Sequence, residues 1–276
     1  MPPQRGPPMT RVPVFLHHHV ANDRPVTVAG FDAQLRWLSR RGFATPTLDR
    51  LLDHVSGARP LPRHSLLLTF DDGYADNWFC VYPLLRQHGL RATVFLTTGC
   101  VTRGGIRAAL AEHGASPETI RSERRPEGFL SWDEVRAMAV DGVIEFGSHS
   151  HTHNGFDRRR PWPDLAEELV RSKAVIEDET GKPVVALAWP WGRCDERLTE
   201  AARRAGYRLA FTTELGANRP HEDPMRIRRI KVRRGGAMWL ASRIAIYTTP
   251  GLCGAYVGLT RLELSVRRAL GLRGPR

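Results

Sequence analysis

The sequence contains few cysteines, and none of them is arranged to hold a metal ion. They are widely scattered and include no C-x-x-C pair, which argues against a cysteine-ligated zinc site. Each lies in or beside an expected core segment, where a free thiol acts as a small apolar group. This usage suits a reducing compartment. The four are Cys80, Cys100, Cys194 and Cys253.

Lysine is also scarce, so the net charge of +12 is carried almost entirely by arginine. The lysines are Lys173, Lys182 and Lys231. A charge of this sign could recruit nucleic acid or anionic lipid. However, no basic stripe interleaved with aromatic residues accompanies it. We therefore interpret the arginines as a basic surface and expect no nucleic-acid partner.

Long apolar runs are missing. A transmembrane helix needs roughly 18 or more apolar residues, and the nearest candidate, residues 237–259, is broken by Arg243 and Pro250. The first residues lack the apolar stretch of a signal peptide. We therefore expect a cytoplasmic location, with export or peripheral membrane attachment as alternatives. Residues 237–276 are expected to form a basic helical extension packed on the main domain, and shallow membrane contact is the alternative use.

A strand–helix alternation runs along most of the 276 residues, a length that suits one large α/β domain or two small ones. Ser131 and Glu134 form a capping-box pattern, and Gly89 and Gly181 are expected to end two other helices. The alternation predicts a parallel sheet, open or closed into a barrel. The expected strands are 12–16, 66–70, 92–97, 143–146, 184–188 and 209–212, and the expected helices include 31–41, 75–88, 164–180 and 196–205.

Two segments fall outside this alternation. Residues 1–10 are expected to be a disordered tail before a catalytic domain of residues 11–236. Residues 99–128 contain several glycines and a charged block. An insertion of this length on the loop side of an α/β enzyme often shapes access to the substrate.

Two neighbouring aspartates follow an apolar run, in the segment Thr69-Phe70-Asp71-Asp72-Gly73. In a parallel α/β protein the carboxyl ends of the strands converge, and active sites are built there. Adjacent side chains of a strand point to opposite faces, but at a turn permitted by Gly73 both carboxylates can reach one cavity. Taken alone, the segment is more typical of a solvated turn.

Two histidines follow another expected strand, in the segment His149-Ser150-His151-Thr152-His153. His149 and His153 are spaced i, i+4, which places both imidazoles on one side of a helix or tight turn; His151 is expected to point away. One carboxylate with two imidazoles suits zinc or a similar ion and leaves a position open for water. The second carboxylate stays free as a base, so the two segments predict a metal-dependent hydrolase.

With these residues in view, the chain resembles the polysaccharide deacetylases, carbohydrate esterase family 4, which carry the NodB homology domain. Residues 69–73 match their motif T-F-D-D-G, and residues 149–153 match H-[ST]-x-x-H. Residues 187–192, Leu-Ala-Trp-Pro-Trp-Gly, resemble the third motif in its F-A-Y-P-Y-G form. Residues 228–230 resemble a late strand, and residues 15–20 resemble an opening L-M-Y-H-H-V segment.

The resemblance implies a distorted (β/α)7-type barrel of parallel strands, with a metal-dependent deacetylase site at the carboxyl ends of the strands. Carried over residue by residue, it implies that Asp72, His149 and His153 bind a divalent ion. Zinc is expected first, although such a ligand set also accepts cobalt, manganese, nickel or iron. Asp71 is then the general base, and the backbone N–H of Tyr74 holds the oxyanion.

The third motif is expected to bind substrate through Trp189, Pro190 and Trp191. The two tryptophans would offer flat apolar walls that suit sugar rings, and the alternative for both is ordinary core packing. The expected partner is an N-acetylated glycan. The sugar, its linkage and the oligomeric state are left open.

Two departures from the family pattern stand out. Many members carry an arginine that orients the base two residues before the motif-three proline, where this chain has Ala188. Many also end with an L-x-H motif whose histidine is the general acid, but no histidine follows Met225. His18 is the substitute candidate for that acid, with His17 and His19 as alternatives.

The leading hypothesis is therefore a metal-dependent deacetylase acting on N-acetylated amino sugars in a polysaccharide or smaller glycan. One alternative is a hydrolase of a non-sugar linear or cyclic amide on the same fold. The other is a catalytically silent glycan-binding protein.

Overall fold

The computed structural model of the chain describes residues 11–107, 128–154 and 162–269. The expected tail of residues 1–10 and most of the insertion at residues 99–128 lie outside these ranges.

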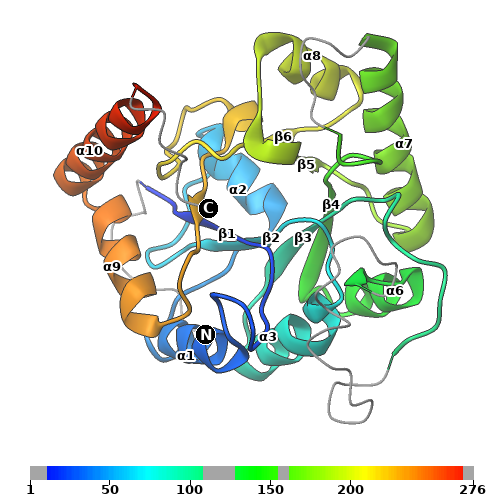
Figure 1. Cartoon of the computed structure of the whole chain (residues 1–276), viewed down its shortest axis with the longest axis horizontal. Coiled ribbons are helices and arrows are strands. Elements are labelled where there is room, and N and C mark those ends of the chain that lie inside the picture. Colours follow the sequence, from blue (N-terminus) through cyan, green and yellow to red (C-terminus); the bar gives the residue numbers. More distant parts are fainter. Residues whose placement is uncertain (1–10, 108–127, 155–161, 270–276) are drawn as a thin grey trace.

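Seven strands form one curled sheet, and every pair of neighbours in it runs parallel. Its order is β6-β5-β4-β3-β2-β1-β7, so the first strand lies inside the sheet and the last one covers its edge. Figure 1 shows the strands curving around a centre with helices outside them. The strands are β1 Val14–His17, β2 Leu67–Phe70, β3 Ala92–Leu96, β4 Ile144–Ser148, β5 Ala186–Ala188, β6 Leu209–Phe211 and β7 Ile230–Lys231.

Irregular backbone joins the two edges of the sheet. Phe211 at the end of β6 forms a bridge with Ile227, and Val12 before β1 forms one with Asn218. The segment between β6 and β7 therefore fills the gap that an eighth strand would occupy in a regular barrel. The result is the distorted (β/α) barrel that the resemblance implied.

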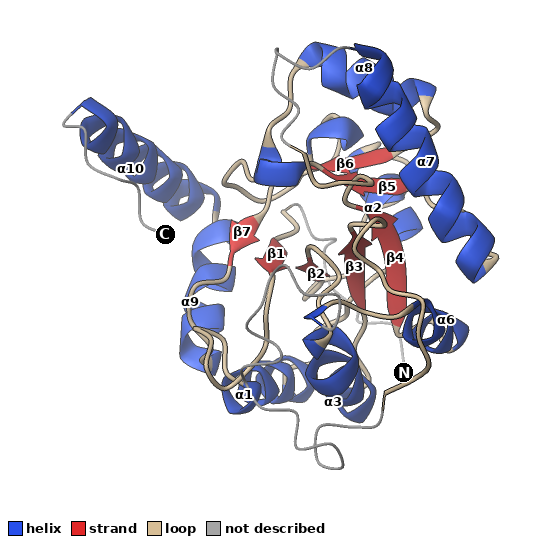
Figure 2. Ribbon diagram, turned by 45° about the vertical axis from the view of Figure 1, so that its right-hand side comes forward, coloured by secondary structure: helices blue, strands red, loops and turns tan. Residues whose placement is uncertain are grey.

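Helices surround this sheet (Figure 2). The capping box is present: Ser131 Oγ accepts from the Glu134 N–H, and the Glu134 carboxylate accepts from the Ser131 N–H. Gly89 ends α3 with a φ of 65°, a left-handed conformation that costs glycine little. The helices are α1 Val28–Arg40, α2 Leu48–Val55, α3 Tyr82–His88, α6 Trp132–Val140, α7 Trp162–Thr180, α8 Glu196–Arg204, α9 Ala237–Thr248 and α10 Pro250–Ala269.

Two helical segments differ from the sequence-based expectation. The helix expected over 75–88 includes a π-helical turn, Asn77–Val81, before α3. Just ahead of this turn the Asp76 carboxylate accepts from the Val20 N–H and contacts His19 Nδ1. Helix α2 was not anticipated. Its buried leucines and valine follow the i, i+3, i+4, i+7 pattern of an amphipathic helix, at Leu48, Leu51, Leu52 and Val55.

Side chains along each strand alternate between two cores. One core lies between the sheet and the helices, and the other lies inside the barrel, where α2 closes it. Val12, just before the first strand, and Val14 at its start face the interior, whereas Phe15 packs in the outer core. Continuing this alternation places His18 on the interior side and His17 against the helices.

His17 is accordingly buried, with its ring stacked on Phe70 and its Nδ1 3.3 Å from the Thr69 carbonyl oxygen. Burial lowers the pKa of His17 from 6.5 to about 4, although the contact with Thr69 opposes the shift. The unfolded state therefore binds a proton at higher pH than the folded state does. We expect the free energy of unfolding to fall by about 3 kcal/mol through this group as the pH drops from 6.5 to 4. Urea unfolding at several pH values measures this free energy. For His17→Gln it should change less with pH than for the wild type, whereas His221→Gln, at an exposed position, should show the wild-type pH dependence.

The C-terminal region forms two helices. Helix α9 packs on α1, and Trp239 meets Phe15 edge to face at a centroid distance of 6.5 Å. Helix α10 contacts α9 and extends away from the barrel in both views (Figures 1 and 2). Within the described ranges, none of the helices has the length and hydrophobicity needed to cross a membrane.

Candidate active site

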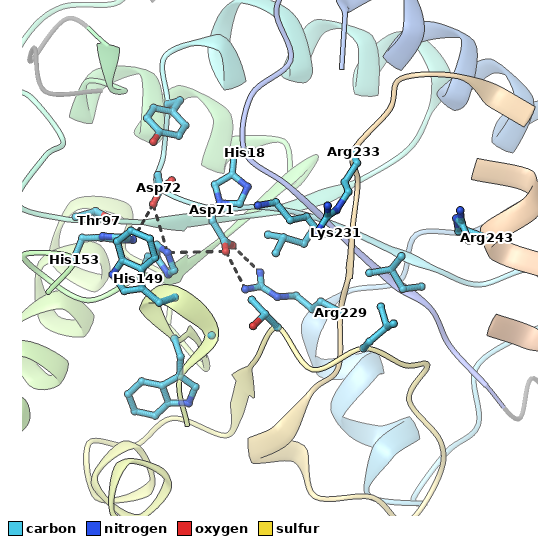
Figure 3. Close-up of a pocket in the computed structure, with 18 of the residues that line it drawn as sticks. His18, Asp71, Asp72, Thr97, His149, His153, Arg229, Lys231, Arg233 and Arg243 are labelled. Atoms are coloured by element: carbon cyan, nitrogen blue, oxygen red, sulfur yellow. Dashed lines mark hydrogen bonds and ion pairs between the residues drawn. The ribbon is translucent and has the colours of Figure 1, made fainter. Parts of the chain in front are cut away.

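One carboxylate and two imidazoles meet at the carboxyl ends of β2 and β4. Asp72 Oδ1 lies 3.4 Å from His149 Nε2 and 3.3 Å from His153 Nε2. The three ligand atoms all lie within 4.8 Å of one another. His151 points away, with its Nδ1 2.9 Å from Thr98 Oγ1. The structure thus brings together the three residues that the motifs predicted as metal ligands (Figure 3).

The backbone after β4 forms a tight turn that aims the two histidines at one point. His149 Nδ1 donates to the Ala188 carbonyl oxygen at 2.8 Å, which leaves Nε2 free to face Asp72. Ser150 has a φ of 67°, and its Oγ accepts from the His153 N–H at 3.1 Å. The two histidines, spaced i, i+4, are therefore brought together by a turn and not by a helix.

Several residues of this region have a left-handed backbone although they are not glycine. A conformation of this kind costs about 1–3 kcal/mol and persists only where the surrounding structure enforces it. The φ angles are 76° at Asp72, 67° at Ser150, 54° at His153 and 62° at Trp191. Such outliers cluster at functional sites, where they aim a side chain that a relaxed backbone would turn away.

The donor set fits a divalent metal ion. Two imidazole nitrogens and one carboxylate oxygen from converging strand ends are typical of zinc sites that keep an open position. The hydrogen bond from His149 to the Ala188 carbonyl oxygen fixes the tautomer whose Nε2 lone pair can bind a cation.

Asp71 lies beside this cluster but is held by a different partner. Its carboxylate accepts two hydrogen bonds from the Arg229 guanidinium, at 2.7 Å to Oδ1 and 2.9 Å to Oδ2. Both side chains are buried. Burial alone would raise the pKa of Asp71, but Arg229 and then His149 lower it to about 2. Asp71 is therefore ionised at neutral pH.

Arg229 is the site residue that the sequence-based analysis missed. Its guanidinium lies over the adjoining rings of Phe95 and Phe211, at 5.8 and 5.9 Å from their centroids. In many family members an arginine at the position of Ala188 contacts the catalytic aspartate. Here Arg229, at the other edge of the sheet, makes the contact with Asp71. The only sequence signal was its place in the 228–230 segment that resembles a late strand.

The remaining predicted residues have different environments. His18 borders the same cavity as Asp71 and Asp72. Burial lowers the pKa of His18, and the two aspartates only partly oppose this shift. The Tyr74 ring stacks between His19 and Phe129, at centroid distances of 3.7 and 5.2 Å.

The third motif splits its aromatic residues between the core and the surface. Trp189 follows the inward-facing Ala188, so its side chain is fully buried in the outer core, although it is also among the residues that line the cavity. Pro190 is buried at the start of a short 3₁₀ turn, Pro190–Gly192. Trp191 is 68% exposed and lies 5.5 Å from the His153 ring. Trp191, not Trp189, therefore presents an accessible aromatic face beside the candidate ligands.

A cavity of about 980 Å³ opens over these groups. Its volume lies at the upper end of the range of small-molecule sites, about 300–1,000 Å³. Trp191 and His153 line one part, and residues of β7, α9 and α10 line another.

A family model described as polysaccharide deacetylase matches residues 58–210. The chain belongs to the polysaccharide deacetylase family. It is thus an enzyme of the hydrolase class that acts on carbon–nitrogen bonds other than peptide bonds, and the resemblance drawn from its motifs is confirmed.

Individual relatives support this membership at low sequence identity. YxkH of Bacillus subtilis, named as a polysaccharide deacetylase, is 25% identical over 230 residues, which cover 82% of this chain and 72% of that protein. The poly-beta-1,6-N-acetyl-D-glucosamine N-deacetylase of Escherichia coli K12 is 25% identical over 217 residues. That match covers 69% of this chain but only 31% of the E. coli enzyme.

Solved structures show the same fold. The deacetylase PplD of Streptococcus pyogenes, solved with acetate, has a TM-score of 0.71 at 20% identity. The match covers 88% of this chain and 100% of the PplD chain. IcaB of Ammonifex degensii has a TM-score of 0.70 at 22% identity. This match covers 84% of the present chain and 96% of the IcaB chain. Both support the distorted barrel as the architecture of the chain.

Replacing Arg229 with lysine is expected to lower kcat about tenfold and to leave KM nearly unchanged. Lysine keeps the charge but cannot make the two parallel hydrogen bonds that orient the Asp71 carboxylate. Steady-state kinetics should be compared with those of Arg228→Lys, because Arg228 pairs with Glu222 instead. Wild-type kcat in Arg229→Lys would show that the orientation of Asp71 does not depend on Arg229.

Proposed function

We propose that this protein is a metal-dependent deacetylase that removes acetyl groups from N-acetylated amino sugars of a polysaccharide or smaller glycan. The observation that carries the proposal is the pairing of two groups with separate tasks. Asp72, His149 and His153 form a candidate ligand set, and the Asp71 carboxylate, held by Arg229, lies 3.9 Å from His149 Nε2. A hydrolase that activates water needs both an electrophilic centre and a base beside it.

Asp72, His149 and His153 would hold the divalent ion. Zinc fits this set best, and cobalt, manganese, nickel or iron are the alternatives. When bound, such an ion acts as a Lewis acid that lowers the pKa of a water molecule and polarises the acetyl carbonyl. The left-handed backbone at Asp72 and His153 keeps their side chains aimed at this position.

Asp71 is the proposed general base. Because its pKa is held low, it is ionised and ready to accept a proton from the attacking water. Arg229 positions the carboxylate and keeps it from turning toward the histidines. The new C–O bond forms as the water loses this proton, and the backbone N–H of Tyr74 is proposed to donate to the oxygen that gains negative charge.

The C–N bond then breaks, and the departing nitrogen needs a proton. His18 is the proposed donor, because it borders the cavity on the side of Asp71. With its pKa lowered, His18 is neutral before the reaction. The proton that Asp71 has taken from water is therefore the nearby source from which His18 protonates the amine. The products are acetate and a free amino sugar.

Trp191 is proposed as the platform on which a sugar ring stacks. Its exposed face lies next to His153, and a flat apolar ring complements the apolar face of a hexose. Relatives of this chain are named for an N-acetylglucosamine polymer, which makes an N-acetylhexosamine the first substrate to try.

Acetate release from a series of N-acetylglucosamine oligomers tests the proposal. The protein should be assayed after metal removal, after addition of zinc and with no treatment. Release that is lost on metal removal and restored by zinc is the expected result, and the dependence on oligomer length would separate polymer from small-glycan substrates. Metal binding without any acetate release would reject neutral N-acetylglucosamine oligomers as substrates and leave an acidic sugar or a non-sugar amide to be tested. Failure to bind metal would reject the catalytic proposal and favour a silent glycan-binding protein.

A further inference from the structure

One wall of the cavity carries positive charge that the proposed deacetylation does not use. Lys231 at the end of β7 and Arg233 just beyond it both line the cavity. Figure 3 shows the Lys231 side chain reaching toward His18, with Arg233 next to it. Both residues are exposed, and across residues 11–107, 128–154 and 162–269 neither side chain forms a hydrogen bond or ion pair.

The strand alternation explains why these cations face inward. Ile227 belongs to the interior core, so Arg229, Lys231 and Arg233 fall on the same side at intervals of two residues. Ile230 and Val232, between them, are buried in the outer core. Arg229 is neutralised by Asp71. Among the residues that the structure describes, no carboxylate pairs with Lys231 or Arg233.

A third cation extends this wall. Arg243 of α9 lines the cavity, and its guanidinium lies over the rings of Trp239 and Tyr256, at 5.5 and 4.9 Å from their centroids. Cation–π contacts of this kind hold the guanidinium in place but leave its N–H groups able to donate.

The carboxylates of the cavity do not balance this wall. Among the described lining residues they are Asp71, Asp72 and Glu263. Asp71 is paired with Arg229, and Asp72 faces the two histidines. Glu263 of α10 is the third, so among the described lining residues three carboxylates face four cations: Arg229, Lys231, Arg233 and Arg243. A neutral acetylated sugar could accept hydrogen bonds from Lys231 and Arg233 but would bring no negative charge to compensate theirs.

We propose that Lys231 and Arg233 form an anion subsite, and that the sugar this enzyme accepts carries a phosphate or carboxylate group near its acetylated amine. This inference rests on the proposed function, because it concerns the substrate of the same site. An anionic oxygen at this wall accepts charge-assisted hydrogen bonds from both side chains. Charge complementarity of this kind selects acidic glycans over neutral ones.

Binding to the full-length, zinc-loaded Asp71→Asn variant tests the subsite without turnover. The probes are N-acetylglucosamine, its 1-phosphate, its 6-phosphate and N-acetylglucosaminuronic acid, titrated by calorimetry at low salt. At least one acidic sugar should bind about tenfold or more tightly than the neutral one. The sugar that does so identifies phosphate or carboxylate as the recognised group.

Charge-removing variants in the same background assign the preference to this wall. The pair Lys231→Gln and Arg233→Gln should abolish it while leaving the affinity for N-acetylglucosamine unchanged. Arg234→Gln is the matched control, because Arg234 is exposed and falls on the opposite side of the alternation. Equal binding of all four probes, or a preference that survives the double change, overturns the inference.

Acetate release by the wild-type enzyme tests the proposed function independently of the anion subsite. Release from neutral and acidic probes with equal kcat/KM would keep the deacetylase and reject the subsite. Tighter binding of an acidic sugar with no release from any probe would keep the subsite and reject the deacetylase.

Discussion

Replacing Asp71 with asparagine is expected to lower kcat for acetate release about a thousandfold. An amide cannot accept the proton of the attacking water, and positioned general bases contribute typically about 10²–10⁴-fold to rate. The three candidate metal ligands stay in place, so the variant should bind zinc with nearly wild-type affinity. Metal content and kcat measured on the same preparation test both parts of the prediction.

Asparagine also leaves the Arg229 guanidinium buried opposite a neutral group. Removing one partner of a buried ion pair costs about 3–5 kcal/mol of stability, so thermal unfolding must confirm that the variant is folded at the assay temperature. Arg229→Gln breaks the same ion pair but keeps the Asp71 carboxylate, so comparing the two variants separates the loss of the base from the loss of the ion pair. If folded, zinc-loaded Asp71→Asn kept kcat within tenfold of the wild type, Asp71 could not be the base.

The fold and the ligand set were accessible from the sequence for a physical reason. Buried parallel strands appear as short apolar runs, and their carboxyl ends must meet at one edge of the sheet. Residues that follow Leu66–Leu68 and Val143–Phe146 are therefore neighbours in space although they are far apart in the chain. The cluster of Asp72, His149 and His153 agrees with this reasoning.

Arg229 could not be assigned in the same way. It lies 158 residues from Asp71 in a stretch of several arginines, and only the alternation relative to the barrel interior distinguishes it from Arg228. That alternation depends on the bridge of Phe211 with Ile227, a contact between irregular segments that leaves no periodic pattern in the sequence.

The tryptophans of the third motif show the same limit. Residues 187–192 identify the motif, but the direction of each ring depends on the phase of β5. Ala186 and Ala188 face the interior, which sends Trp189 into the outer core. The left-handed backbone at Trp191 then turns the second ring outward. Composition and spacing alone leave both orientations open, and the two rings consequently differ in their access to a sugar.

Loss of His149 is expected to abolish metal binding and activity together. His149 is buried, and because its Nδ1 donates to the Ala188 carbonyl oxygen, its Nε2 is the atom that faces the site. With two ligands left, zinc affinity should fall at least a hundredfold in His149→Gln, and acetate release should fall to background. Zinc titration followed by calorimetry, with acetate release from the same sample, measures both.

Thermal unfolding provides a readout that does not depend on the substrate. A ligand at about 100 times its Kd stabilises a folded protein by about 2.7 kcal/mol, so zinc should raise the Tm of the wild-type protein. It should not raise the Tm of His149→Gln. His151→Gln is the matched control, because His151 lies two residues away and contacts Thr98 instead of the cluster. A zinc-dependent rise in Tm that persisted in His149→Gln and disappeared in His151→Gln would place the metal elsewhere and remove the basis for assigning Asp71 as its neighbouring base.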